Sequence, residues 1–362
     1  MAKLSVTLRA GQHLPVSCIR SQSVADRAGS RVSRARSTAA ADSLWPISSP
    51  ASGAGRADRI QGACVPIDSP FTRRSGLRAA LAATVALPVL GTTLSRQAHA
   101  AAAPEARLDV MSYNVRFASN KPPHTWAERR PATKEMLLRA QPHIIGTQEG
   151  LYYQLQDIES DIGANYDWVG TGVGGGSRDE FMAVFYDNRR LFPLEYEHFW
   201  LSDTPYTIAS NTWGANSPRM ATWVRFLDLV TNTQLYVLNT HLDHVSQNAR
   251  ERSATLMAER IALMKTSTPL IVTGDFNATA HNSAVYTTML GAGLVDTWDA
   301  AKERGPAYGT FGGYKPPVVG GGRIDWILTR PSAQVHSASM NTFSLGGQYP
   351  SDHLPVQATL TL

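Results

Sequence analysis

The sequence predicts an α/β (α+β) fold, a four-layer αββα sandwich in which two stacked, mostly antiparallel sheets are flanked by helices. Two observations indicate this class. Strand patterns flanked by helical patterns occur at both ends of the C-terminal two thirds of the chain, with a β-rich stretch between them. The apolar, β-branched runs 144–149 and 269–275 are typical of buried strands, and each ends in a carboxylate.

The first elements alternate between strand and helix. The pattern predicts strands at 108–115 and 142–149, and helices at 126–140 and 152–162. The first helix is amphipathic, and we expect it to end before Pro142, because proline cannot continue a helix.

The middle of the chain predicts a meander of strands. Glycine, Asn-Arg and Thr-Asn sequences, which are typical of turns, separate its apolar runs. The predicted strands are 167–170, 181–186, 196–201, 221–230 and 234–239.

The last portion returns to mixed helix and strand. Its helix at 249–264 is the longest, with Leu256, Ile261 and Leu263 among the apolar positions of a strongly charged pattern. After it the pattern predicts a strand at 270–275, a helix at 283–290, and strands at 323–328, 335–343 and 354–362.

Residues 1–100 are expected to be targeting sequence rather than fold. Within 65–100, a twin arginine at Arg73 and Arg74 precedes an uncharged apolar run and the small-residue site Ala98-His99-Ala100, which is typical of an export signal peptide. The apolar run is too short for a membrane anchor, which needs about 20 residues. Residues 1–64 are Ser/Ala/Arg/Gly-rich, so we interpret them as a disordered leader or as the product of a start assigned too early.

The charge of the chain divides at the same place. Residues 1–100 contain 13 of the 34 basic residues and 4 of the 29 acidic residues, so 101–362 carry 21 basic against 25 acidic residues. This mild acidity argues against a broad nucleic-acid footprint. Both cysteines, Cys18 and Cys64, also precede residue 101, so the exported domain would be stable without disulfides.

Polar groups lie at the end of an apolar run in each of four segments, 147–149, 239–242, 274–277 and 351–353. Acids, amides and imidazoles gathered at strand ends indicate a hydrolytic metal site. Each segment alone has a structural interpretation: Asp275 and Asn277 could cap a helix or shape a turn, and His241 could be a hydrogen-bonded core residue.

Six motifs in order carry a resemblance to a known family. They are Tyr113-Asn114, Gln148-Glu149, Thr240-His241-Leu242, Gly274-Asp275-Phe276-Asn277, Arg323-Ile324-Asp325 and Ser351-Asp352-His353. The set resembles the endonuclease/exonuclease/phosphatase superfamily, whose DNase I-like fold is shared by nucleases, neutral sphingomyelinases and inositol-polyphosphate phosphatases. The resemblance covers 108–362 and implies hydrolysis of a phosphoester.

The resemblance implies a divalent metal, because a negatively charged phosphoester repels the attacking hydroxide. Glu149 is the first ligand we assign, with help from Asn114. Oxygen ligands suit Mg²⁺, with Mn²⁺ as the alternative. Residues 101–362 contain no cysteine and no His-x₃-His pair, which argues against zinc. Asp352 is either a ligand of a second metal or a supporting residue.

The resemblance also implies catalytic roles. Asp275 would orient or deprotonate the attacking water, and Asn277 would hold that water or a phosphate oxygen. His241 and His353 would donate to the non-bridging oxygens. Asp325 would keep His353 protonated, because an adjacent carboxylate raises the pKa of an imidazole. Both Asp275 and the Asp325–His353 pair remain candidates for the general base.

Residues outside the shared motifs are candidates for substrate binding. Arg219 precedes a predicted strand and could fork onto a phosphate, although a surface ion pair explains it equally well. Trp126 is a second candidate, and Arg129, Arg130, Trp213, Asp243 and His244 are of the same kind. Asp243 and His244 could equally cap the following helix.

We therefore expect an exported, Mg²⁺-dependent phosphoesterase that hydrolyses a phosphomonoester or a phosphodiester by in-line attack of water. The alternatives are a secreted nuclease and a catalytically inactive binding module on the same fold, and the intact set of motifs argues against the second. Besides the phosphoester substrate, we expect no stable nucleic-acid partner, no membrane span and a monomer.

Overall fold

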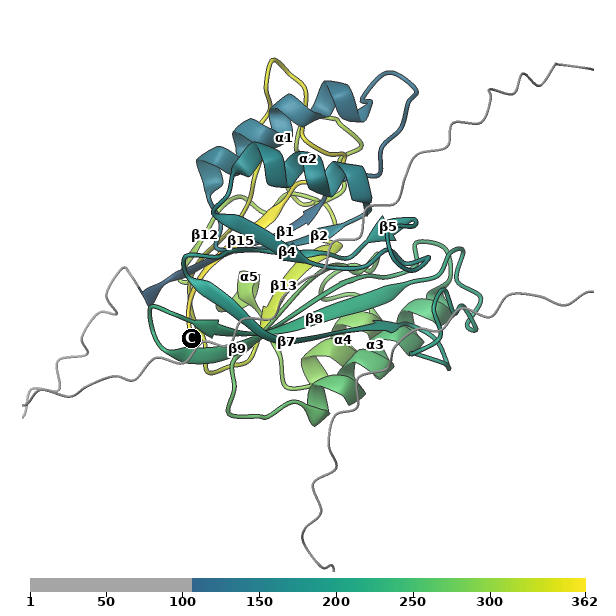
Figure 1. The fold of residues 1–362 in the computed structure, drawn as a ribbon, viewed down its shortest axis with the longest axis vertical. Coiled ribbons are helices and arrows are strands. Elements are labelled where there is room, and N and C mark those ends of the chain that lie inside the picture. Colours follow the sequence, from purple (N-terminus) through teal and green to yellow (C-terminus); the bar gives the residue numbers. More distant parts are fainter. Residues whose placement is uncertain (1–105) are drawn as a thin grey trace, which may run out of the picture. The chain divides into compact units, whose positions relative to one another are not determined.

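The computed structural model describes residues 106–362, in which two stacked sheets carry helices on both outer faces (Figure 1). The predicted α+β sandwich is thereby confirmed. The predictions for 1–64 and 65–100 lie outside the described residues. Within 106–362, no helix combines the length and apolar character needed to cross a membrane.

The first sheet has seven strands. In sheet order they are β12 (Glu303–Arg304), β14 (Gln334–Met340), β15 (Val356–Thr361), β1 (Leu108–Asn114), β2 (Ile144–Gln148), β6 (Val184–Asp187) and β4 (Tyr166–Val169). β1 and β2 are parallel and pair Asn114 with Gln148. Their carboxyl ends therefore reach the same edge of the sheet.

The second sheet has six strands, and a small separate pair lies beside the first sheet's β2. In order the six are β11 (Val295–Asp296), β13 (Asp325–Thr329), β10 (Leu270–Asp275), β9 (Thr233–His241), β8 (Met220–Asp228) and β7 (Leu191–Trp200). The pair consists of β3 (Gly150–Leu151) and β5 (Glu180–Phe181). β9 and β10 are parallel, so both of their carboxyl ends reach one edge as well.

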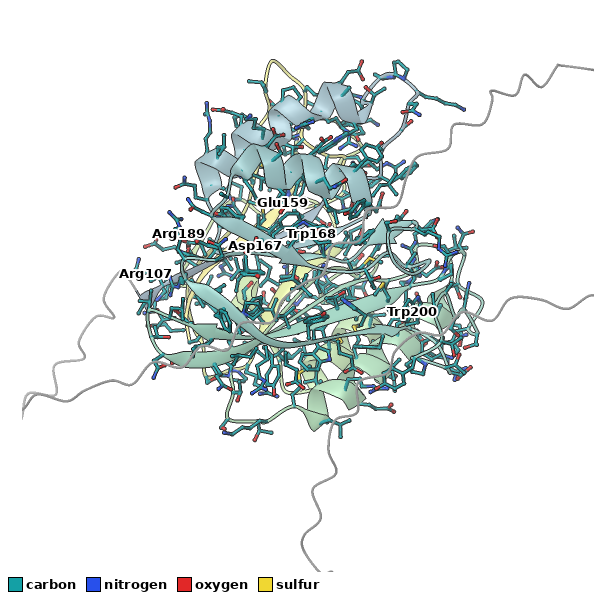
Figure 2. The ribbon with its side chains drawn as sticks, in the orientation of Figure 1. Arg107, Glu159, Asp167, Trp168, Arg189 and Trp200 are labelled. Carbon is teal, nitrogen blue, oxygen red and sulfur yellow. The ribbon has the colours of Figure 1, made fainter. Side chains whose placement is uncertain are left out.

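Helices complete the four layers (Figure 1). α1 (Trp126–Ala140) and α2 (Tyr152–Ile162) cover the first sheet, whereas α3 (Gln247–Leu263) and α4 (Ala284–Gly291) cover the second. A capping box of Thr125 and Glu128 begins α1. The short α5 (Thr297–Ala300) contacts β13 and β14. Figure 2 labels Glu159 of α2 and Trp168 of β4, whose Nε1 donates to the Glu159 carboxylate and joins helix to sheet.

The two sheets approach each other closely where β2 faces β9 and β10. A Cβ on Gly146 would lie 1.9 Å from Thr273 Oγ1 and 2.7 Å from Asn239 Oδ1, so only glycine fits there. Asn239 is fully buried and connects the sheets: its Nδ2 donates to Thr147 O at 2.7 Å, and its Oδ1 accepts from Gln148 Nε2 at 2.7 Å. These contacts fix the end of β2 directly before Glu149.

The structure corrects three details of the prediction. The predicted strand 181–186 is divided, because β5 pairs with β3 and only β6 joins the first sheet. The predicted meander is also divided, since β4 and β6 lie in the first sheet and β7, β8 and β9 in the second. In α3, Leu263 is 81% exposed, because the buried face follows Ala249, Ser253, Met257 and Ile261 at four-residue spacing.

Candidate active site

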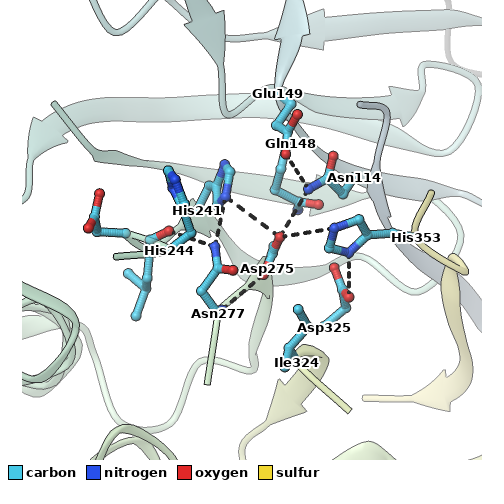
Figure 3. Close-up of polar contacts among 12 residues, drawn as sticks. Asn114, Gln148, Glu149, His241, His244, Asp275, Asn277, Ile324, Asp325 and His353 are labelled. Carbon is cyan, nitrogen blue, oxygen red and sulfur yellow. Dashed lines mark hydrogen bonds and ion pairs between the residues drawn. The ribbon is translucent and has the colours of Figure 1, made fainter. Parts of the chain in front are cut away.

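Strand register gathers the polar groups at one edge of the sandwich. Asp275 at the end of β10 pairs with His241 of β9 on one side and with Asp325 of β13 on the other. Asn114 and Glu149 arrive from the ends of β1 and β2 in the opposite sheet. His353 lies just before β15, and Figure 3 shows all six side chains converging. The sequence-predicted metal and catalytic residues Asn114, Glu149, His241, Asp275, Asn277, Asp325 and His353 therefore form one cluster.

Asp275 stands at the centre of this cluster. Its Oδ2 accepts a hydrogen bond from Asn114 Nδ2 at 3.0 Å and lies 3.6 Å from His241 Nε2 and 3.7 Å from His353 Nε2. Burial, together with the negative charge of Asp325, raises the pKa of Asp275 to about 7. The carboxylate can therefore exchange a proton near neutral pH.

Asp325 and His353 form a buried pair. The distance from His353 Nδ1 to Asp325 Oδ2 is 2.9 Å, so the ring donates from Nδ1 and directs Nε2 toward Asp275. Burial alone would lower the pKa of His353, but the carboxylates of Asp325 and Asp275 outweigh it and raise that pKa to about 10. His353 is therefore an imidazolium at neutral pH.

Glu149 supplies the carboxylate of a candidate metal site, and Asn114 holds that carboxylate in place. Asn114 Nδ2 donates to Glu149 Oε1 at 3.0 Å, and the backbone N–H of Phe117 donates to Oε2 at 3.0 Å. Glu149 has φ 63°, a left-handed conformation that a glutamate adopts only when its surroundings enforce it. Strain of this kind is typical of residues held for function.

These donors fit a hard divalent cation. Glu149 and Asp275 are two buried carboxylates connected through one amide, and together with His241 they form a group whose ligand atoms lie within 4.8 Å of one another. Oxygen-rich sets of this kind suit Mg²⁺, which retains several waters. A positive ion here would also offset the repulsion between the two carboxylates.

Arg219, His241 and Asn277 form a row of N–H groups beside Asp275. Arg219 Nη1 lies 2.9 Å from His241 Nδ1, and Asn277 Nδ2 lies 3.1 Å from His241 Nε2. Burial, together with the charge of Arg219, holds the pKa of His241 well below its ordinary value. Arg219 is also buried, so the alternative interpretation of it as a member of a surface ion pair is wrong.

A cavity of about 430 Å³ opens onto this cluster, a volume within the range of small-ligand sites. Its lining adds Ile324 of the Arg323-Ile324-Asp325 motif and four residues that no motif contains, Arg116, Phe117, Glu180 and Phe311. Arg116 lies two residues after Asn114, and this proximity to the motif was the available signal. Burial, with the charge of Glu149, raises the pKa of Glu180 to about 7. His244, one of the candidates, lines the cavity as well.

Other sequence candidates lie elsewhere. Trp126 packs in the core under α1, donates from Nε1 to Asp157 and does not line the cavity. Arg129 is fully buried and donates to the backbone oxygens of Val115, Arg116 and Pro350, so it holds the loops that carry Asn114 and His353.

Two further candidates are placed next to the cluster rather than in it. Asp352 lies 3.5 Å from Arg116, which also reaches Glu149 at 3.5 Å. Asp243 accepts the backbone N–H groups of Val245 and Ser246 and so shapes the turn before α3, whereas the helix itself is capped by Ser246. Trp213 packs in the core beneath the second sheet.

A second acidic group among the described residues is already neutralised. His281, Asp296 and Asp299 could surround an ion, but Arg323 Nη2 lies 2.8 Å from Asp296 and 3.2 Å from His281. The guanidinium supplies the positive charge there, so we place the metal site at Glu149.

Comparison with known proteins agrees with this geometry. Residues 111–353 match the Endonuclease/Exonuclease/phosphatase family. No curated protein matches the chain in sequence.

A mannosyl-6-phosphatase of Bacteroides thetaiotaomicron VPI-5482 is 32% identical, with a TM-score of 0.66, over 70% of this chain and 100% of its own. An endonuclease/exonuclease/phosphatase from Bacteroides vulgatus is 28% identical, with a TM-score of 0.67, over 71% of this chain and 99% of its own. The D. rerio TDP2, complexed with single-strand DNA product, is 19% identical over 71% of this chain and 99% of its own, and its TM-score of 0.57 shows a shared fold.

Proposed function

The chain belongs to the endonuclease/exonuclease/phosphatase family, and from this premise we propose that it is an exported, Mg²⁺-dependent phosphatase that hydrolyses a phosphomonoester. Members of this family are hydrolases of phosphoesters. The observation that carries the proposal is the convergence on Asp275: a buried carboxylate with a pKa of about 7 lies within 3.7 Å of an amide and two imidazoles.

The metal-binding part of the proposal rests on Glu149 and Asn114. Glu149 would hold Mg²⁺ with its carboxylate. Asn114 would orient that carboxylate, because its Nδ2 donates to both Glu149 and Asp275 while its Oδ1 accepts from the backbone N–H of Arg116. A bound Mg²⁺ would neutralise charge on the phosphoryl and leaving oxygens. Manganese, which also accepts oxygen ligands, is the alternative metal.

Asp275 is the general base in this proposal. Burial and the charge of Asp325 raise the pKa of Asp275 above the ordinary value of a carboxyl group, so its carboxylate accepts a proton from the attacking water more readily than an exposed carboxylate does. His353 is protonated at the same pH because its pKa is about 10, so it donates to a phosphoryl oxygen rather than accepting a proton. This difference favours Asp275 over the Asp325–His353 pair, which the sequence left as equal candidates.

The remaining donors would hold the phosphoryl group. Arg219 provides a charged guanidinium, which binds phosphate oxygens in a forked geometry. Asn277 provides an amide N–H beside it, and the neutral ring of His241 carries one N–H. These preorganised donors would stabilise the negative charge that develops in the transition state.

The choice of a monoester is supported by the similarity to the mannosyl-6-phosphatase, which is 32% identical over its full length. The DNA-bound structure shares only the fold at 19% identity, so it does not favour a nuclease. The choice of export is supported by Arg73, Arg74 and the Ala98-His99-Ala100 site.

A panel of phosphoesters tests this function. The purified protein is assayed with and without Mg²⁺ on sugar phosphates, phospholipids, nucleic acids and cell-wall polymers. We expect release of inorganic phosphate from a monoester that requires Mg²⁺, and loss of that release in Asp275→Asn. Preferential cleavage of nucleic acid would establish the nuclease alternative, and binding without hydrolysis of any ester would establish the binding module.

A further inference from the structure

We propose that Glu180 and Phe311 form a substrate-recognition subsite that selects phosphomonoesters of hydroxyl-rich compounds, such as sugars, and excludes those whose organic part carries a second anionic group. The inference rests on the proposed function, because it assigns the part of the cavity that the hydrolytic groups leave free. The metal, the attacking water and the phosphoryl group are already assigned to Glu149, to Asp275, and to His353 with Arg219, His241 and Asn277. Glu180 and Phe311 line the same cavity and have no part in those steps.

Glu180 presents a carboxylate with free acceptor capacity. Its side chain is 30% exposed, and its Oε2 lies 3.6 Å from Arg219 Nη1 and 4.0 Å from His241 Nδ1. Among residues 106–362, no donor lies within hydrogen-bond distance of this carboxylate, and Glu180 belongs to none of the groups able to surround a metal. Its oxygens are therefore available to a hydroxyl of the substrate.

The backbone fixes Glu180 in this position. In β5, Glu180 pairs with Leu151 of β3, two residues after Glu149. Its carbonyl oxygen accepts from the N–H of Val173 at 2.9 Å, and the carbonyl of Val173 accepts from Trp200 Nε1 at 2.8 Å. A carboxylate held by ordered backbone loses little entropy when it binds a ligand, which favours specific recognition.

Phe311 provides an apolar surface in an otherwise polar cavity. It is 58% exposed although its backbone forms a β-bridge with His353, and the two rings lie 5.1 Å apart at 60°. An exposed aromatic ring next to catalytic groups offers a flat face for the C–H surface of a sugar ring. The substrate would then meet an aromatic face near His353 and a hydrogen-bond acceptor near Arg219.

Electrostatics supports the exclusion of a second phosphate. Arg219 lies 3.6 Å from both Glu180 and Asp243, so two carboxylates offset its positive charge. An anionic group bound next to Glu180 would find the positive charge of Arg219 already engaged by Glu180 and Asp243, so its binding there is unfavourable. A neutral hydroxyl would instead donate to the carboxylate, and a site built for a hydroxyl discriminates strongly against compounds that lack it.

Glu180→Gln in the full chain tests the assignment with three substrates: mannose 6-phosphate, mannose 1,6-bisphosphate and methyl phosphate, which lacks hydroxyls and a ring. We expect kcat/KM for mannose 6-phosphate to fall by about 10-fold, the scale of one hydrogen bond to a charged group. For methyl phosphate it should change by less than about 3-fold, because only the phosphoryl group is held there. The ratio of kcat/KM for mannose 6-phosphate to kcat/KM for mannose 1,6-bisphosphate should be smaller in Glu180→Gln than in the parent.

Phe311→Ala is the second variant, and because the ring is exposed it leaves the core intact. It should lower kcat/KM more for mannose 6-phosphate than for methyl phosphate, because only the sugar contacts the ring. The matched control is Asp179→Asn, which removes a negative charge next to Glu180 from an exposed residue outside the cavity. All three substrates should react with this control at the parent rates.

Three results would overturn the subsite. One is an equal fall for mannose 6-phosphate and methyl phosphate in Glu180→Gln. Another is a shift in the Mg²⁺ concentration needed for half-maximal activity, which would make Glu180 a metal ligand. The third is a loss of kcat/KM for mannose 6-phosphate in Asp179→Asn as large as the loss in Glu180→Gln. A further outcome is that the parent hydrolyses phosphomonoesters while both variants, Glu180→Gln and Phe311→Ala, keep the parent's ratios of kcat/KM among the three substrates. That result would contradict the subsite and leave the proposed function standing. A parent that hydrolyses no phosphomonoester contradicts the proposed function itself.

Discussion

Glu149 carries the clearest residue-scale prediction, because its strained backbone and its two hydrogen bonds serve one carboxylate. Glu149→Ala should lower activity by at least about 10²-fold, the scale of losing a stabiliser of transition-state charge. The metal-free variant should be as stable as the parent or slightly more stable, because one of two neighbouring buried carboxylates is removed. Initial rates over a Mg²⁺ titration, together with thermal unfolding, measure both effects.

A control for this variant is Glu259→Ala, an exposed change on α3 that should alter neither property. Parent-like hydrolysis by Glu149→Ala at saturating Mg²⁺ would show that the metal lies elsewhere. Unfolding of the variant would show that Glu149 has a structural role.

The Asp325–His353 pair gives a pH-dependent prediction. Asp325→Asn removes a carboxylate that raises the pKa of His353 to about 10, so that pKa should fall. If the imidazolium is the active form, activity is lost as pH rises through this pKa, and the alkaline limb of the kcat/KM profile should move to lower pH. Rate profiles between pH 5 and 10 measure the shift.

The opposite role for His353 predicts a different change. If its neutral ring is the general base, the acidic limb moves to lower pH instead, because the neutral form becomes available sooner. Asp275→Asn is the comparison, since loss of the base should depress the rate at every pH. A profile of Asp325→Asn that superimposes on the parent would contradict the pair altogether.

Some site residues could be predicted from the sequence and others could not, for a physical reason. Glu149 and Asp275 follow apolar runs and His353 precedes one, and strand ends at one edge of the sandwich bring such residues together. Glu180 lies in a two-residue strand after a glycine-rich loop, and Phe311 in an irregular segment. Their places depend on pairing with β3 and on a bridge to His353, which local patterns do not encode.

At the scale of elements, the close approach of β2 to β10 gives a stability prediction. Gly146→Ala would place a Cβ 1.9 Å from Thr273 Oγ1, inside two sheets that pack face to face. The variant should lose about 2–3 kcal/mol of unfolding free energy, as overpacked cores do. Activity should fall too, because β2 positions Glu149. Urea unfolding followed by tryptophan fluorescence checks the loss.

Gly291→Ala is the matched control for that prediction. A Cβ at Gly291, in the last turn of α4, would meet no atom within 4 Å. Alanine also favours a helix over glycine, so stability should hold or rise slightly. Equal effects of the two substitutions would show that the sheets can separate at Gly146 without cost.

The elements themselves show where periodicity suffices. α1 and α2 have the predicted bounds because their apolar spacing and ends are local features. The sequence predicts a single strand over 181–186 because this is one apolar run, and only the pairing with β3 separates β5 from β6. The segment 302–322 contains the short β12 and otherwise irregular backbone, so it has no period to detect.

At the scale of the whole molecule, the export proposal predicts the mature form. If Ala98-His99-Ala100 is the cleavage site, secreted protein should begin near Ala101 and contain neither Cys18 nor Cys64. Its net charge should then be about −4 rather than +5, as the distribution of charged residues dictates. Intact-mass spectrometry of secreted material measures the start, and a secreted species that retains either cysteine would contradict export by this signal.

The stability of the whole fold should also depend on pH through His353. Its pKa is about 10 in the folded protein, above the ordinary value of 6.5 that applies on unfolding. The folded state therefore binds more protons between these values, so the stabilisation is complete below pH 6.5 and is lost as pH rises toward 10. One proton corresponds to a slope of at most about 1.4 kcal/mol per pH unit. Urea unfolding of metal-free protein at pH 7.5 to 9.5 should show this decline, and Asp325→Asn should flatten it, because its His353 loses the proton at lower pH. A parent whose stability is constant over this range would show that His353 is not held as an imidazolium.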